Sequence, residues 1–147
     1  MTFVLQFIYS FFACRGFCLM FNLKDRKVAF VSCLCGGFGW IVYLLVRPYV
    51  SVIVANLISA IFIAAFSEVA AKRLSTPSTI FLIIGILPLV PGGGIYYTME
   101  YCIRGMTDAF IEKGLETFGI AGAIAIGVSL VSSIVRIISA YTRRREV

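Results

Sequence analysis

The residues of this chain most able to do chemistry form a short segment of prolines and glycines inside an apolar stretch. The segment reads Pro88-Leu89-Val90-Pro91-Gly92-Gly93-Gly94. An α-helix cannot continue through two prolines and three glycines, and residues 79–87 are too few to cross a bilayer alone. Together with residues 95–104 they make one full span, so the break is expected at membrane depth. Unwound backbone is tolerated there only within protein or beside a watery cavity.

Backbone amides at such a break can bind an anionic group. The amides of Gly92, Gly93 and Gly94 open the second half-helix, whose N-terminal end carries partial positive charge. Transporters use discontinuous helices of this kind to bind carboxylates. We therefore predict a substrate-binding segment that includes Pro88 and Pro91. The alternative is a proline kink that only shapes packing.

Polar residues recur on one face of the apolar stretch 50–71. Asn56, Ser59 and Ser67 lie within about 60° of one another on a helix of 3.6 residues per turn. Hydrogen bonding between helices is the usual role of such residues in membranes, and we expect it for Ser59 and Ser67. Asn56 is predicted to line a polar path and to join the substrate-binding set.

Two ionisable residues stand inside or beside apolar stretches, where charge is costly. Glu68 is a candidate for proton coupling, and it is also placed to form an i,i+4 ion pair with Lys72. Arg136 follows a serine-rich face in residues 129–133, where it either faces an anion or extends toward the headgroups. Both alternatives stay open for each residue.

Small residues at four-residue spacing occur in two stretches, where they let helices approach closely. One set is Ala121, Ala125, Ser129 and Ser133. The other set pairs Ser32 with Gly36, Cys33 with Gly37, and Cys35 with Gly39. We interpret both sets as packing faces, and we expect a chain this short with two such faces to have partners.

The residues needed for catalysis or metal binding are scarce. The chain has no histidine, which removes the commonest general base and metal ligand. No Gly-x-Ser-x-Gly motif, phosphate-binding loop or metal-ligand spacing occurs. The five cysteines are an odd number and mostly lie in apolar stretches, so free thiols are expected. We predict a protein that is not an enzyme and that uses no metal and no cofactor.

Composition places the chain in a membrane. Of its 147 residues 61% are hydrophobic and 14% are charged, against roughly 25% charged in soluble domains, and the mean hydropathy is +1.00. So few charges cannot cover a soluble surface. The net charge of +6 resides in clusters at the ends of apolar stretches, which is typical of membrane anchoring and not of nucleic-acid binding.

The apolar stretches predict an all-α membrane protein that forms a single integral membrane domain over residues 1–147. Each span needs about 20 apolar residues. The five expected spans cover residues 2–21, 28–46, 50–71, 79–104 with the break, and 117–141. Residues 101–116 are amphipathic, and they predict either a short interfacial helix or an outward extension of the fifth helix.

The basic residues predict how the chain is oriented. Segments 22–27 and 72–73 and the tail 143–145 are rich in lysine and arginine, whereas the segments between them are poor. Rich and poor connections alternate, as five spans require. By the positive-inside rule the N-terminus is expected outside and the C-terminus in the cytoplasm.

Four parts of the chain carry recognisable motifs: residues 16–23 (GFCLMFNL), 36–40 (GGFGW), 66–77 (FSEVAAKRLSTP) and 84–92 (IGILPLVPG). Together they resemble the threonine/serine exporter family, in its small-subunit, second-half form. Tyr96, shortly after the break, also fits the family. The resemblance covers nearly the whole chain, and the element PLVPG is its most specific part.

The resemblance implies a multi-pass exporter of the bacterial inner membrane that depends on the proton gradient. It implies a larger membrane partner of the same family and small carboxylate substrates, either threonine and serine or succinate-like dicarboxylates. A homo-oligomer is also compatible with it. Tyr96 and Tyr97 are then expected to add hydrogen bonds to the substrate, and Arg136 is a candidate to face the anion.

Three rival interpretations make different predictions. A non-transporting scaffold or assembly subunit predicts that packing seals the break, with no polar cavity beside it. A channel shares most expectations of the exporter. A lipid-modifying enzyme requires clustered acid, base or metal residues, and the lack of histidine argues against it.

Overall fold

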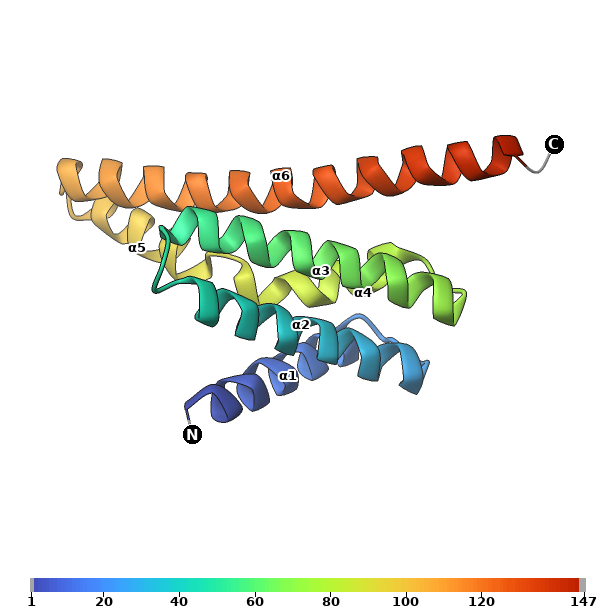
Figure 1. Ribbon diagram of the computed structural model, residues 1–147. Coiled ribbons are helices and arrows are strands. Elements are labelled where there is room, and N and C mark those ends of the chain that lie inside the picture. Colours follow the sequence, from blue (N-terminus) through green and yellow to red (C-terminus); the bar gives the residue numbers. More distant parts are fainter. Residues whose placement is uncertain (1, 146–147) are drawn as a thin grey trace.

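The computed structural model describes residues 2–145, and the side chains of residues 3–139 and 141. Every regular element in this part of the chain is helical (Figure 1). The elements are α1 (Thr2–Met20), α2 (Arg26–Val46), α3 (Val52–Leu74), α4 (Ser78–Ile86), the 3₁₀ turn η1 (Leu87–Leu89), α5 (Gly92–Ile103) and α6 (Thr107–Arg145).

Polar residues at the connections set where helices begin and end. Asp25 caps α2, and its Oδ1 accepts from the amides of Lys27 at 2.8 Å and Val28 at 3.3 Å. Ser51 caps α3 by accepting from the Val54 amide at 3.4 Å. Ser75 ends α3 in the left-handed conformation.

The membrane spans agree with the sequence prediction. Four helices are long and apolar enough to cross a membrane: α1, α2, α3 and α6. The α4–η1 and α5 segments pass the same test as a pair and are bent by 51° at the break, so counting the pair as one span gives five. The all-α membrane fold is confirmed.

The bundle is centred on α2, α3 and α4. Helix α1 packs on α2, whereas α6 packs mainly on α3 and α5. The predicted small-residue face of α2 is buried: Ser32, Cys33 and Cys35 are fully covered. A Cβ added at Gly36 would collide with Cys14, and one at Gly39 would collide with Ile63. The face therefore lets α1 and α3 approach α2 closely.

The connections alternate between the two ends of the bundle (Figure 1). The α1–α2 and α3–α4 connections lie at the end where α6 finishes, and the α2–α3 and α5–α6 connections lie at the other. The basic segments 22–27 and 72–73 thus share one end. Helix α6 starts at Thr107, so residues 107–116 extend the fifth helix outward, which decides between the two interpretations of this segment.

The cysteines are free thiols, as predicted. Cys14, Cys18, Cys33 and Cys35 are buried, and Cys102 is exposed. The Sγ atoms of Cys18 and Cys33 lie 3.8 Å apart between α1 and α2. They fill space between helices, as small apolar residues do.

Candidate functional site at the helix break

The break is built by Pro88 and Pro91. Helix α4 ends at Ile86, one 3₁₀ turn follows, and α5 begins at Gly92 with Pro91 at its N-cap. Proline offers no side-chain cap, so the first amides of α5 have no acceptor from that residue. The Gly92 amide donates to the Val90 carbonyl at 2.7 Å, which leaves Gly93 and Gly94 to provide the free first-turn amides.

A cavity of about 320 Å³ lies beside the break. We call it the charged cavity. Its walls come from α2, α3, the break, α5 and α6, and they mix charged, polar and apolar side chains. The lining residues are Trp40, Tyr43, Arg47, Val52, Asn56, Pro88, Leu89, Val90, Pro91, Gly94, Lys113, Glu116, Thr117 and Ile120.

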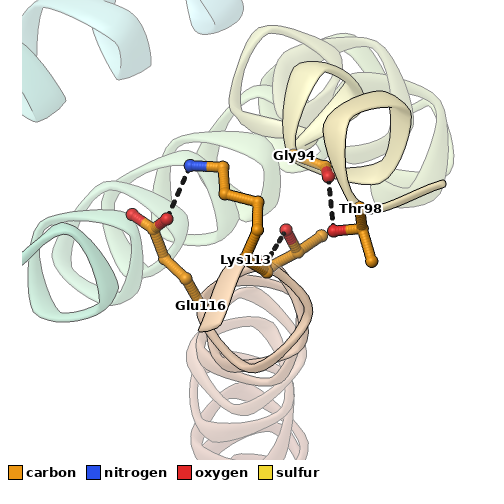
Figure 2. Close-up of polar contacts among 5 residues, drawn as sticks. Gly94, Thr98, Lys113 and Glu116 are labelled. Carbon is orange, nitrogen blue, oxygen red and sulfur yellow. Dashed lines mark hydrogen bonds and ion pairs between the residues drawn. The ribbon is translucent and has the colours of Figure 1, made fainter. Parts of the chain in front are cut away.

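Two cations and one carboxylate give the cavity its electrostatic character. Lys113 Nζ and Glu116 Oε2 form an ion pair at 2.6 Å across one turn of α6 (Figure 2). The Arg47 guanidinium donates to the Val50 carbonyl at 3.3 Å, and it has no acidic partner among the described residues. One positive charge therefore remains uncompensated, which favours an anionic group in the cavity.

Asn56 supplies a neutral polar group to the same cavity. It is 4% exposed, and its Nδ2 donates to the Val52 carbonyl at 2.8 Å. Its Oδ1 accepts no hydrogen bond from the described residues. One turn further along α3, the Ser59 hydroxyl is fully buried and has no hydrogen-bond partner in this part of the chain.

Gly94 holds α5 against α6 at the cavity wall. A Cβ at this position would come within 2.5 Å of Thr117 Oγ1, so only glycine fits. The Thr98 hydroxyl donates to the Gly94 carbonyl at 2.7 Å, and the Thr117 hydroxyl donates to the Lys113 carbonyl at 2.7 Å (Figure 2). Each hydroxyl makes its hydrogen bond within its own helix. The contact between α5 and α6 at Gly94 therefore depends on close packing and not on these hydrogen bonds.

The structure assembles part of the predicted substrate-binding set and leaves the rest apart. Pro88, Pro91, Gly94 and Asn56 line the charged cavity. Gly92 and Gly93 are exposed, and added Cβ atoms there would meet open space. They adopt no positive φ, since Gly105 is the only described glycine that does.

Tyr96 and Tyr97 lie on the outer side of α5. They are 65% and 48% exposed, and their rings contact each other at 5.4 Å. Tyr96 lines a separate depression with Glu100 and Arg104, which form an ion pair at 2.6 Å. Neither tyrosine reaches the charged cavity.

Glu68 and Arg136 lie far from the charged cavity along their helices. Glu68 is twelve residues beyond Asn56 in α3, which is about 18 Å of helix. Its predicted ion pair with Lys72 is wrong: the ion pairs in the described residues are Arg104–Glu100 and Lys113–Glu116. Arg136 is exposed on α6, a full span beyond Glu116.

Sequence reasoning missed the charged half of the cavity. Arg47 lies in one of the connections that the sequence marks only as poor in basic residues. Lys113 and Glu116 lie in the segment 101–116, which the sequence marks only as amphipathic. Arg47 stands out in the sequence as a lone cation between two apolar stretches. Its proximity to the break depends on how the helices pack, so it could not be predicted from the sequence.

The fold and the cavity together define the class of membrane protein to which this chain belongs. An all-α, multi-pass membrane protein with a broken helix beside a charged cavity has the architecture of a solute transporter. The family model described as threonine/serine exporter, ThrE, matches residues 6–134. The chain belongs to the threonine/serine exporter family.

The family assignment agrees with the resemblance seen in the sequence and points to a membrane exporter rather than an enzyme. A search among curated proteins and a search among solved structures each found no significant match.

Proposed function

We propose that this protein is a subunit of an exporter for small carboxylate-bearing metabolites, and that the charged cavity is where the carboxylate binds. The observation that carries the proposal is the meeting of Arg47, Asn56 and the helix break in one cavity. A scaffold protein would need no polar cavity at this place.

The charges of the cavity accommodate two kinds of substrate. An amino acid such as threonine would place its carboxylate at Arg47 and its ammonium at Glu116. A succinate-like dicarboxylate would use Arg47 and Lys113 for its two carboxylates. In both cases the binding groups are pre-positioned, so little ordering entropy is lost.

The proposed exporter works with a larger membrane subunit of the same family. Support for a partner comes from α6, whose face opposite α3 carries Gly122, Ala125, Ser129, Ser133 and Arg136. An added Cβ at Gly122 meets open space, and the other four residues are exposed. The two serines and Arg136 have no hydrogen-bond partner among the described residues. Polar groups facing hydrocarbon are costly, so this face is better suited to another helix than to lipid.

We place the exporter in the bacterial inner membrane, with the N-terminus outside and the C-terminus in the cytoplasm. The shared end of the basic segments 22–27 and 72–73 supports this orientation through the positive-inside rule. The charged cavity then lies in the outer half of the membrane. Glu68 lies toward the cytoplasmic end and is partly buried, which suits the proposed role in proton coupling.

The experiment is transport of labelled substrate into inverted vesicles that contain this chain and the larger family subunit. Arg47→Ala removes a charge-assisted hydrogen bond worth about 1.5–3 kcal/mol, so apparent affinity should fall about tenfold or more. Arg104→Ala is the matched control, because Arg104 lies outside the cavity and pairs with Glu100. Equal transport by the two variants at equal membrane abundance would refute the site.

Glu116→Gln separates the two substrate classes. It removes the proposed partner of an ammonium group and releases Lys113 from its ion pair. Transport of threonine should fall while transport of succinate is retained or rises, if both are substrates. A parallel loss of both would show that Glu116 acts only on the structure of the site.

A further inference from the structure

A second cavity shares a wall with the charged cavity. It has a volume of about 540 Å³ and lies between α1, α2 and the break. Trp40 and Pro88 line both cavities. Within the described part of the chain they are the only residues common to the two sets of lining residues, so the indole and the proline ring form the boundary between the two spaces.

The two cavities differ in chemistry. The charged cavity has Arg47, Lys113 and Glu116 in its walls. Among the residues that the structure describes, the second cavity has no charged lining residue, and its own polar side chains are Gln6, Tyr9 and Ser10. We call it the neutral cavity. It suits the uncharged part of a molecule whose carboxylate is held at Arg47.

Trp40 is held in place from two sides. Its Nε1 donates to Gln6 Oε1 of α1 at 2.9 Å. Its ring stacks on Tyr43 of its own helix, with centroids 5.1 Å apart and planes inclined by 27°. A half-buried indole with its N–H bonded and its face covered has few rotamers that keep both contacts. The boundary is therefore a side chain held by two specific contacts.

We propose that Trp40 is the residue that limits substrate size, and that its hydrogen bond to Gln6 keeps it in that position. This inference rests on the proposed function, since it concerns the substrate of the same site. With the indole in place, the space beside Arg47 is the charged cavity of about 320 Å³. Without it, the charged and neutral cavities become continuous. Longer carboxylates could then keep their contact at Arg47 and extend their uncharged chain toward Gln6 and Tyr9.

The first test compares Trp40→Ala with the unmodified chain on two series of labelled compounds. One series is succinate with its 2-ethyl and 2-butyl derivatives, and the other is serine, norvaline and norleucine, so that in both series the part that grows is uncharged. We expect Trp40→Ala to raise the transport ratio of the longest to the shortest compound by about tenfold, the scale on which pockets discriminate by size. Phe38→Ala is the matched control, because Phe38 lies on the same helix, also packs on α1 through Phe7, and lines neither cavity.

The second test separates the position of the indole from its bulk. Gln6→Leu removes the acceptor of the indole N–H but leaves the ring. The transport ratio of the longest to the shortest compound, which we call the length ratio, should therefore rise less than for Trp40→Ala. Because Trp40 is the only tryptophan of the chain, its fluorescence reports on this wall directly. In Gln6→Leu the emission should shift and acrylamide should quench it more, and short carboxylates should still change the emission.

The possible outcomes separate the inference from the function on which it rests. An unchanged length ratio in Trp40→Ala, with short compounds transported as before, overturns the inference and leaves the proposed function standing. An equal loss of all compounds also overturns it, because Trp40 would then be needed for binding itself. If the unmodified complex transports no compound of either series, both the inference and the proposed function fail.

Discussion

Two helices of this protein carry the same sequence feature and use it differently. Small residues at four-residue spacing occur in α2 and in α6. In α2 they are buried, and added Cβ atoms at Gly36 and Gly39 would collide with α1 and α3 side chains. In α6 the set Ala121, Ala125, Ser129 and Ser133 is exposed.

Helix α6 instead packs on α3 through a different face. A Cβ at Gly127 would lie 3.0 Å from the Leu57 carbonyl oxygen and 3.1 Å from the Ala60 Cβ. A Cβ at Gly119 would lie 2.7 Å from Ile53 Cδ1 of α3. Close approach of α6 to α3 thus depends on two glycines, Gly119 and Gly127, neither of which belongs to the predicted set. A small-residue face therefore predicts contact with some helix, but not necessarily with a helix of the same chain.

The largest loss of folding stability is expected in α2, from the substitution Gly39→Leu. The new side chain has to occupy the space of Ile63, which is fully buried in the core. Overpacking of this kind costs about 1–3 kcal/mol or more. The purified variant should give aggregated or poorly folded protein on size-exclusion chromatography. A monodisperse variant with the parent's apparent Tm would show that the α2–α3 contact is looser than the structure indicates.

A smaller loss of folding stability is expected in α6 from Gly127→Leu, with Gly122→Leu as its matched control. Gly127 faces α3 backbone, whereas an added Cβ at Gly122 meets open space. Gly127→Leu should lower the apparent Tm in detergent and expose α6 to proteolysis. Gly122→Leu should leave both unchanged. Equal behaviour of the two variants would contradict the orientation of α6 about its own axis.

At the helix break, Gly94→Val and Gly93→Val are expected to differ in their effect on export. The Gly94 variant forces Thr117 away and opens the cavity wall, so export should be lost in the complex. Gly93→Val projects into open space, and we expect export within about twofold of the parent, as for exposed substitutions with small energetic effects. Loss of export by Gly93→Val at normal abundance would mean that the exposed glycines contact a partner or the substrate.

The smallest effect on the isolated chain is expected from the double variant Ser129→Leu, Ser133→Leu. Both positions are exposed and make no hydrogen bond with described residues, so the apparent Tm should stay the same. Co-purification with the larger family subunit should be strongly reduced, because leucines prevent close approach of helices. Retained co-purification would place the partner elsewhere.

Much of the fold could be predicted from the sequence because bilayer physics restricts it. A span needs about 20 apolar residues and must be helical, so composition and break residues determine the number, length and class of the elements. The predicted spans 28–46 and 50–71 differ from α2 and α3 by only a few residues at their ends. The sequence predicts the break at Pro88, Pro91 and Gly94, which line the charged cavity, because proline and glycine act locally on the backbone.

Which side chains surround the break was decided by the tertiary structure. Whether Arg47 and Lys113 share a cavity with Asn56 depends on how α2, α3 and α6 are rotated about their axes, which helical periodicity leaves undetermined. Tyr96 and Glu68 were sensible candidates by residue type, yet the bend after Pro91 turns Tyr96 outward and the length of α3 keeps Glu68 distant. Local chemistry thus determined the spans and the break, whereas the set of side chains around the break was settled by helix packing, since that packing depends on contacts between residues far apart in the chain.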